Sequence, residues 1–450
     1  IRNILNTAKW RNRNLHQLCL VVTHRGAPND QRSVVGSRIE KIEGEGILVK
    51  DPEVGTKAFL PYHRVIEMRD DEGALVWDRE GGLHALPQPV AVVAEARDSS
   101  VDVVVAGDGM LTIDGSAGEG GGQILRSSLT LSMLTGQPFR LVNIRAGRRK
   151  PGLKRQHLTC VEAARAISGA KVQGASLHSS ELVFEPGEVR SGEYAFDVGT
   201  AGSVALVLQT IAMPLALAEG PSSVRIGGGT HARWAPPIPF VLEAWLPCVR
   251  RMGVQMDLKM TRVGFFPAGG GEVVATFKGA SALREYHAVY DHADLELEAH
   301  AIVAGLPEGI ARRELIAVET GVPLAMTLHA GTVRSPGPGN ACWLIAWGES
   351  EDNGNSAVNV FSAIGEKSTP AEEVAGKVSA QFMEWYAAGV GVDEYLADQL
   401  LLPIALAGGG SFTTTKPSLH SWTNIAVIAA FGLPRFAVTQ SGESFEVRLG

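Results

Sequence analysis

The stretch Leu111-Thr112-Ile113-Asp114-Gly115 is followed by Gly118-Glu119-Gly120-Gly121-Gly122-Gln123 and then by a segment with one apolar face from Ile124 to Leu134. This order predicts a strand, a glycine-rich turn and an amphipathic helix. Glycines before a helix let the backbone approach a ligand, and the free N–H groups at the helix start favour an anion. The run lacks the Gly-Lys-Ser/Thr of a P-loop and is a poor dinucleotide fingerprint. We therefore expect an anion-binding corner of another kind.

The glycine run contains one carboxylate, Glu119. An acid beside a phosphate-binding turn indicates a divalent metal that bridges the two. A solvated glutamate in an ordinary strand–turn–helix corner is the alternative, and this motif alone leaves both open.

A basic segment follows between Arg140 and His157 and contains no acid. Its glycines and prolines predict a loop rather than a helix face. Because the whole chain has a net charge of −7, contact with nucleic acid requires a local patch of this kind. We expect the segment to bind a nucleic-acid backbone. Its cations are Arg140, Arg145, Arg148, Arg149, Lys150, Lys154 and Arg155.

The glycine corner recurs along the chain. Gly199-Thr200-Ala201-Gly202-Ser203 leads into an apolar helix expected over Val204 to Leu217, and Gly391 precedes a third corner that leads into Leu400 to Ala407. Strand patterns flank each corner, so we predict an internally repeated α/β body whose corners converge at one end. Another loop, Trp234-Ala235-Pro236-Pro237, offers a flat proline surface for a nucleobase or is simply a turn.

Near the end of the chain, Pro417-Ser418-Leu419-His420-Ser421-Trp422-Thr423-Asn424-Ile425 places a histidine before a buried strand or a helix start. An imidazole nitrogen is a good nucleophile when a neighbour fixes its tautomer, and we expect Thr423 and Asn424 to do so. A lone histidine is more often a surface or core residue, so this motif alone does not establish a nucleophile.

Composition limits the class of protein. With 45% hydrophobic and 20% charged residues, the chain of 450 residues can bury a large core. No apolar run approaches the ~20 residues of a membrane span, and the first residues lack a signal pattern. Four scattered cysteines, without a Cys-x-x-Cys pair, argue against a disulfide framework or a thiolate zinc site. We expect a cytoplasmic protein.

Patterns along the chain predict a β-rich domain over residues 1–82, a Pro/Ala/Val-rich linker over 83–110, and the α/β body over 111–283 and 389–450. Residues 284–388 lack glycine corners and predict an inserted α/β domain. In the first domain, His24-Arg25-Gly26-Ala27-Pro28 and Pro61-Tyr62-His63-Arg64 each join a histidine to an arginine. Such pairs hold phosphate or are ordinary surface turns.

Residues 111–450 resemble the RNA 3′-terminal phosphate cyclase family. The motifs that carry the resemblance are Asp114-Gly115, Gly118-Glu119-Gly120-Gly121-Gly122-Gln123-Ile124-Leu125-Arg126, Arg145-Ala146-Gly147-Arg148, Pro151-Gly152-Leu153-Lys154-Arg155-Gln156-His157, Gly202-Ser203, Leu208-Gln209-Thr210, Pro267-Ala268-Gly269-Gly270-Gly271, Glu394-Tyr395-Leu396-Ala397-Asp398-Gln399 and His420-x-x-Thr423-Asn424. The resemblance implies three βαβαββ units like the C-terminal domain of the third bacterial initiation factor, and a small thioredoxin-like insert.

The resemblance also implies an ATP-dependent reaction on RNA. His420 would attack the α-phosphorus of ATP and form a histidine–AMP adduct, and AMP would pass to an RNA 3′-phosphate. The adjacent 2′-hydroxyl would then close a 2′,3′-cyclic phosphate and release AMP. Glu119 would hold Mg²⁺ or Mn²⁺. The charge-neutralising residues would be Arg126, Arg145, Arg148 and Arg155, and the nucleotide-binding residues Gln156, His157, Gln209, Pro236, Pro237, Tyr395, Leu396, Ala397, Asp398 and Gln399.

Two features depart from the family. His231 follows Gly-Gly-Thr where an aspartate is usual, and residues 1 to about 80 form an additional module. That module resembles the RNA cyclic-group end recognition domain through its two His–Arg clusters, Trp10 and Gly36-Ser37-Arg38-Ile39. A catalytically silent ribosome-assembly scaffold and an RNA-end sensing protein are the alternatives to an enzyme. The oligomeric state stays open.

Overall fold

The computed structural model divides into two compact units, the first chiefly residues 1–94 and the second chiefly residues 95–450, with the short segments 387–389 and 439–445 assigned to the first. The residues that the structure describes are Leu5, 18–23, 31–42, 45–50, 57–69, 75–79, 82–83, 91–92, 103–105, 110–288, 295–348 and 357–449. The cluster at residues 24–28, Trp10 and most of the expected linker therefore lie outside the described residues.

The first unit is built from short antiparallel strands around a small apolar core that includes Leu20, Ile47 and Met68. Two short 3₁₀ turns, η4 (Gly36–Arg38) and η5 (Tyr62–Arg64), each lead directly into a strand. The side chains of His63 and Arg64 are exposed at the second turn. The strands are β1 (Cys19–Thr23), β2 (Gln31–Val35), β3 (Ile39–Ile42), β4 (Gly46–Lys50), β5 (Lys57–Pro61), β6 (Val65–Arg69), β7 (Leu75–Asp78), β8 (Gly82–Leu83) and β9 (Ala91–Val92).

The second unit contains three sheets that share an arrangement of four strands, and β10 is added antiparallel at the edge of the first. In each set of four, taken in chain order, the first two strands are parallel and the fourth lies between the second and the third: β11-β12-β14-β13, β15-β16-β18-β17 and β19-β24-β26-β25. The strands are β10 (Val103–Val105), β11 (Leu111–Asp114), β12 (Phe139–Val142), β13 (Lys171–Gln173), β14 (Leu182–Glu185), β15 (Glu193–Asp197), β16 (Ser222–Gly228), β17 (Met256–Arg262), β18 (Gly271–Phe277), β19 (Tyr286–Ala288), β24 (Gly410–Thr414), β25 (Ala437–Ser441) and β26 (Ser444–Leu449).

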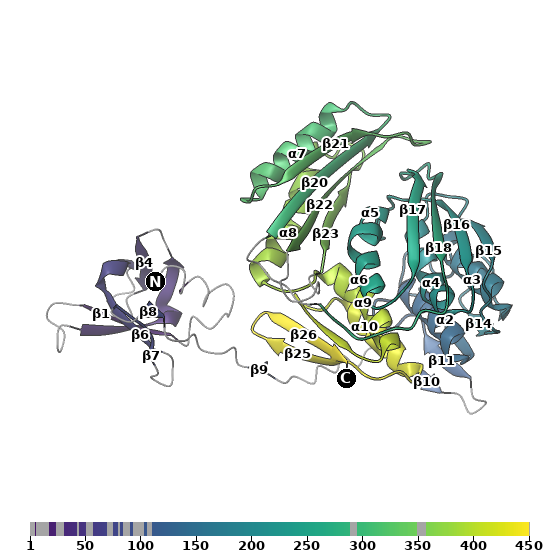
Figure 1. Ribbon diagram of the computed structural model, residues 1–450, viewed down its shortest axis with the longest axis horizontal. Helices are drawn as coiled ribbons and strands as arrows, with labels where there is room; N and C mark the ends of the chain where they lie inside the picture. The colour runs from purple at the N-terminus through teal and green to yellow at the C-terminus, as the bar shows by residue number, and fades with distance from the viewer. Residues whose placement is uncertain are drawn as a thin grey trace. The chain divides into compact units, whose positions relative to one another are not determined.

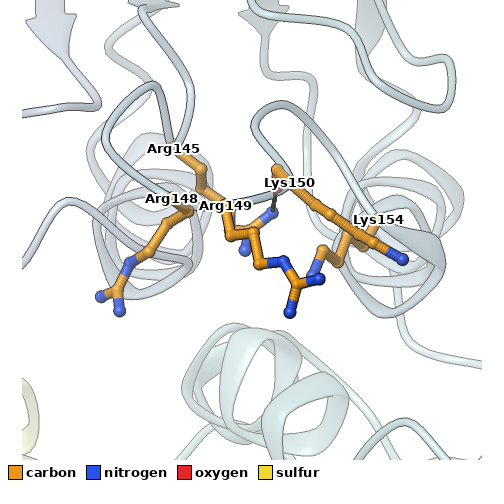
Figure 2. A pocket seen from close by; sticks show the side chains of 5 residues that line it. All are labelled: Arg145, Arg148, Arg149, Lys150 and Lys154. Carbon is orange, nitrogen blue, oxygen red and sulfur yellow. Dashed lines mark hydrogen bonds between the residues drawn. The ribbon is translucent and has the colours of Figure 1, made fainter.

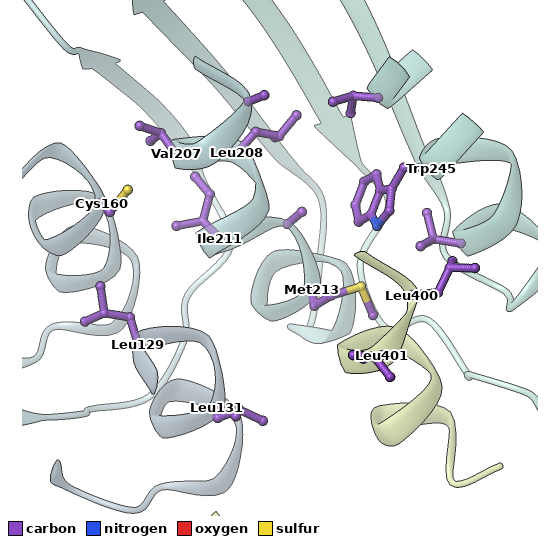
Figure 3. Close-up of a cluster of buried hydrophobic side chains, with 14 of the residues drawn as sticks. Leu129, Leu131, Cys160, Val207, Leu208, Ile211, Met213, Trp245, Leu400 and Leu401 are labelled. Atoms are coloured by element: carbon purple, nitrogen blue, oxygen red, sulfur yellow. The ribbon is translucent and has the colours of Figure 1, made fainter. Parts of the chain in front are cut away.

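Helices of the three sheets pack against one another and form the main core (Figure 1). α4 is apolar except at Gln209 and Thr210, as expected of a helix surrounded by other elements, and it occupies the predicted range Val204–Leu217. Figure 3 shows side chains from α2, α3, α4, η6 and α9 meeting in this core. The helices are α2 (Gln123–Thr135), α3 (Arg155–Ser168), α4 (Val204–Leu217), α5 (Ile238–Phe240), η6 (Val241–Trp245), α6 (Leu246–Arg251), α9 (Glu394–Ala407) and α10 (Leu419–Ala430).

The remaining segment forms a mixed four-stranded sheet, ordered β21-β20-β22-β23, with helix α7 packed on it (Figure 1). Trp385 of α8 is buried against Phe361 of β23 and Phe382. The elements are β20 (Leu295–Ala304), α7 (Gly309–Gly321), β21 (Thr327–Thr332), β22 (Gly339–Gly348), β23 (Asn359–Ile364) and α8 (Ala371–Ala388). Among the described residues, no helix combines the length and the apolar character needed to cross a lipid bilayer.

Candidate active site

His420 lies in the first turn of α10, and its side chain is 53% exposed. Ser418 caps this helix, because its hydroxyl accepts a hydrogen bond from the backbone N–H of Ser421 at 3.1 Å. The segment 425–428, for which strand and helix were both open, is therefore helical. The unpaired N–H groups at the start of α10 favour negative charge beside His420.

The prediction that Thr423 and Asn424 fix the tautomer of His420 is wrong. Both side chains are buried, and their polar atoms are bonded elsewhere. The Thr423 hydroxyl donates to the carbonyl of Leu419 at 2.6 Å, and the amide of Asn424 donates to the carbonyl of Asp398 at 3.2 Å. The partner of His420 is instead Gln123, the first residue of α2, whose Oε1 lies 2.6 Å from Nδ1 of His420.

A chain of hydrogen bonds leads from His420 into the interior. Gln123 Nε2 donates to Asp398 Oδ1 at 2.6 Å, and Gln399 Nε2 donates to Asp398 Oδ2 at 2.7 Å. Gln209 Nε2 in turn donates to Gln399 Oε1 at 2.5 Å. A carboxylate can only accept hydrogen bonds, so Asp398 binds the NH₂ group of the Gln123 amide. The amide oxygen of Gln123 is thereby directed toward His420. Nδ1 of His420 must then carry the proton, and Nε2 keeps a free lone pair.

Asp398 is a buried carboxylate that receives amide donors on both oxygens. Burial raises its pKa, while the hydrogen bond from Gln123 and the nearby charges of His420 and Arg126 oppose that rise. Arg126 of α2 is half-buried, and burial lowers its pKa. The arrangement places a partly compensated negative charge behind the imidazole, on the side away from Nε2.

The glycine run is hydrogen-bonded directly to α10, the helix that carries His420. The Thr423 hydroxyl accepts a hydrogen bond from the backbone N–H of Glu119 at 3.0 Å, and a Cβ at Gly118 would lie 2.2 Å from that hydroxyl oxygen. Gly118 also has a φ of +56°, which favours glycine. Two segments 304 residues apart in the sequence are thereby held in contact.

Glu119 points inward, with only 5% of its side chain exposed. Its Oε2 lies 2.6 Å from Arg148 Nη2, its Oε1 accepts from the backbone N–H of Gln123 at 3.2 Å, and the same Oε1 lies 4.0 Å from Nδ1 of His420. Arg148 also donates to the carbonyls of Glu119 and Gly120, at 2.6 and 3.3 Å. Arg148 thus joins the basic loop to the glycine run.

His157 of α3 lies beside Gly122, where the glycine run meets the start of α2. Its Nδ1 accepts from the backbone N–H of Lys154 at 3.2 Å, so its Nε2 carries the proton. A Cβ at Gly122 would lie 2.6 Å from that Nε2 and 2.8 Å from Arg126 Nη1. Burial, followed by the charge of Arg126, lowers the pKa of His157 to about 3. His157 is therefore a neutral donor beside the start of α2.

The loop between β12 and α3 forms a basic pocket of about 330 Å³, lined entirely by cationic residues (Figure 2). Arg145 holds the loop together, because its Nη1 donates to the carbonyls of Lys150 and Gly152 at 2.8 and 3.0 Å. Arg149 and Lys150 are exposed and have no ion-pair partner among the residues that the structure describes. Burial and the neighbouring cations lower the pKa of Lys154. The lining residues are Arg145, Arg148, Arg149, Lys150 and Lys154.

A second, polar pocket of about 50 Å³ lies between the helices and has room for a few water molecules. Its lining includes the predicted residues Arg126, Gln209, Asp398 and Gln399. It also includes Trp245, whose Nε1 donates to the carbonyl of Gln399 at 3.3 Å. The sequence did not predict Trp245 as a residue of the site.

The other residues predicted to bind the nucleotide range from buried to exposed. The side chains of Leu396 and Ala397 are buried in the apolar core, so only their backbone could meet a ligand. Gln156 accepts from the backbone N–H of Ser203 at 3.4 Å. Tyr395 is 53% exposed. Pro236 is half-buried and Pro237 is buried, and their stacking role with Tyr395 stays a prediction.

Comparison with known proteins adds an independent finding. A family model described as RNA 3′-terminal phosphate cyclase matches residues 117–438. A Ralstonia nicotianae protein named RNA 3′-terminal phosphate cyclase is 51% identical over 326 residues, covering 71% of this chain and 91% of the relative. Proteins of the same name from Salmonella enteritidis and Ectopseudomonas mendocina are 43% and 46% identical, covering 76% and 74% of this chain and 98% and 96% of the relatives.

Proposed function

The chain belongs to the RNA 3′-terminal phosphate cyclase family, and we propose that it converts an RNA 3′-phosphate into a 2′,3′-cyclic phosphate with His420 as nucleophile. The observation that supports this role is the relay from Asp398 through Gln123 to Nδ1 of His420, which leaves Nε2 free. A phosphate monoester lacks a good leaving group, and ATP supplies one through covalent catalysis.

In the first step, Nε2 of His420 attacks the α-phosphorus of ATP. The N–P bond forms, the bond to the bridging oxygen breaks, and pyrophosphate leaves. The imidazole gains positive charge while Nδ1 keeps its proton. Asp398, acting through Gln123, and Glu119, whose Oε1 lies 4.0 Å from Nδ1, both stabilise that charge. The N–H groups of α10 face the developing phosphate charge.

In the later steps, an oxygen of the RNA 3′-phosphate bonds to the phosphorus of the adduct, the N–P bond breaks, and neutral His420 is restored. The adjacent 2′-hydroxyl then bonds to the 3′-phosphorus, the P–O bond to AMP breaks, AMP leaves, and the hydroxyl proton passes to solvent. These later transfers concentrate negative charge on the RNA end, which Arg126, Arg148 and the basic pocket would offset.

Glu119 fits a role in holding Mg²⁺ or Mn²⁺. Mg²⁺ usually takes one or two carboxylates and fills its other positions with water and substrate phosphate oxygens, so one buried carboxylate beside a basic pocket is an adequate donor set. When bound, the ion would neutralise phosphate charge. Arg148 engages Oε2 and the backbone N–H of Gln123 engages Oε1, so the ion would bind through the remaining lone pairs of this carboxylate.

We also propose the finer fold and binding assignments. The shared strand order of three sheets supports three units like the C-terminal domain of the third bacterial initiation factor, and the β21-β20-β22-β23 sheet supports a thioredoxin-like insert. Tyr395 and Pro236-Pro237 would lie on either side of adenine, with Gln209, Asp398 and Gln399 bonding toward the nucleotide.

Two measurements test the proposed reaction. Intact mass after incubation with ATP and Mg²⁺ should increase by one AMP. An RNA with a 3′-phosphate should become resistant to phosphatase only when ATP is present. A full-length chain that gains no mass and leaves the RNA end phosphatase-sensitive would contradict the proposal.

The basic pocket should bind the RNA end. We expect the double variant R149A/K150A to bind 3′-phosphate RNA roughly tenfold more weakly. The slope of log affinity against log salt concentration should fall by about one to two, because about that many phosphate contacts are lost. Self-adenylylation with ATP alone should be retained. The Lys150 carbonyl that holds Arg145 is unaffected by this change. K278A, which removes an exposed cation elsewhere, is the matched control. Equal RNA binding by all three proteins would exclude this role.

The N-terminal module is proposed to retain the RNA end, as its resemblance to the cyclic-group end recognition domain implies. Its exposed His63 and Arg64 follow one another at η5, which supports contact with phosphate. Removing residues 1–90 should weaken binding to RNA 3′-ends severalfold and preserve the ATP-dependent mass increase. Loss of the mass increase on deletion would show that the module belongs to the catalytic body instead.

A further inference from the structure

The four-stranded sheet β21-β20-β22-β23 carries two histidines and a carboxylate on one face. Side chains at alternate positions of a strand share a face, so Glu298 and His300 of β20 lie together. The parallel register pairs His300 with His329 of β21. Leu297 and Ala299, which alternate with them along β20, are buried in the interior. The three polar side chains therefore occupy the opposite, partly exposed face.

Their ligand atoms converge. One oxygen or nitrogen atom from each of Glu298, His300 and His329 lies within 4.8 Å of the others. Glu298 Oε2 is 3.4 Å from His300 Nε2 and 3.9 Å from His329 Nε2. Ligands about 2.1 Å from a tetrahedral zinc ion lie about 3.4 Å from one another, so only a small contraction is needed.

The site is also held in place from behind. The ring of His300 stacks on Trp343 of β22, with centroids 5.1 Å apart and planes at 3°, and on His329, at 4.5 Å and 20°. The stack with Trp343 holds the ring of His300, while His329, which is half-exposed, must turn out of its stack so that both rings can direct a nitrogen at one ion.

The local charge is negative. Within the described part of the chain, Glu298 has no lysine or arginine ion-pair partner, and its ion-pair contacts are His300 and His329. A carboxylate without a permanent cation beside it attracts a positive ion.

We propose that Glu298, His300 and His329 form a binding site for a first-row divalent transition ion of the zinc type, with a further position open to water or an external ligand. Two imidazoles and one carboxylate favour such an ion over Mg²⁺, which prefers oxygen donors. The site uses none of the residues assigned to ATP or RNA, so it stands or falls separately from the proposed reaction.

Co²⁺ titration of the chelator-treated full-length chain tests the site. We expect one Co²⁺ per chain to produce visible absorption bands and to be displaced by Zn²⁺. H329Q, at a half-exposed position on a strand surface, should weaken binding on the order of tenfold or more with the circular dichroism unchanged, and E298Q/H300Q/H329Q should abolish it.

Two matched variants separate this site from others. E119Q removes the carboxylate proposed for the catalytic ion, and H178N removes an exposed histidine elsewhere, so both should retain the Co²⁺ bands at full intensity. Absence of a one-to-one complex, unchanged affinity in H329Q, or loss of the bands in E119Q would each overturn the proposal.

Discussion

His420→Asn is expected to abolish transfer of AMP to the protein, and with it cyclisation of RNA. His420 lies in the first turn of α10, and because its Nδ1 is bonded to Gln123, its Nε2 is the nitrogen left for attack. The loss should therefore exceed about 10⁴-fold, the scale seen when a nucleophile is removed from its catalytic unit. Intact mass spectrometry after incubation with ATP measures the adduct directly.

The matched control is His178→Asn. His178 is exposed and has a φ of +67°, a conformation that asparagine tolerates well. This variant should form the adduct at the rate of the unmodified chain. If His420→Asn still gained one AMP, the nucleophile would have to be another residue. The hydrogen bonds from Asp398 through Gln123 to His420 would then have no role in adduct formation.

Gln123→Leu is expected to have the second largest effect. Leucine fills the same buried space but cannot connect Asp398 to Nδ1 of His420. The imidazole then loses the contact that selects its tautomer, and Asp398 loses one of its amide donors. We expect adenylylation to slow by roughly 10²-fold or more, because an incorrect tautomer places a proton on the attacking nitrogen.

A spectroscopic measurement distinguishes a positioning role from simple misfolding. The ¹⁵N shifts of the His420 ring should indicate the Nδ1–H form in the unmodified chain and a mixture of tautomers in Gln123→Leu. Ser132→Ala, on the same helix, removes a hydrogen bond to the carbonyl of Gln137 and should leave both the shifts and the rate unchanged. A single, unaltered tautomer in Gln123→Leu would refute the relay.

Local patterns predicted much of the fold because they act over short distances. The apolar run of α4 and the glycine run before α2 each specify a structure from neighbouring residues alone. The bounds of α4 match the prediction, and the chain is a mixed α/β protein as expected.

The partner of His420 could not be predicted in the same way. Thr423 and Asn424 were favoured because they are close to the histidine in the sequence, but tertiary packing turns both toward the interior. Gln123 is 297 residues away in the sequence, and its role depends on α2 and α10 meeting. Its only sequence signal was its place at the start of a helix that follows glycines. Trp245 gave no such signal, because an aromatic residue in an apolar segment usually indicates core packing.

The bond between the Glu119 N–H and the Thr423 hydroxyl also sets an order of events during synthesis. A ribosome that has released Glu119 must translate 304 further residues before this bond can form. For most of that interval the basic loop has been synthesised and His420 has not. Loop closure over such a separation slows folding. If His420 is the nucleophile, reaction with ATP can therefore begin only after α10 has been synthesised and has met the glycine run.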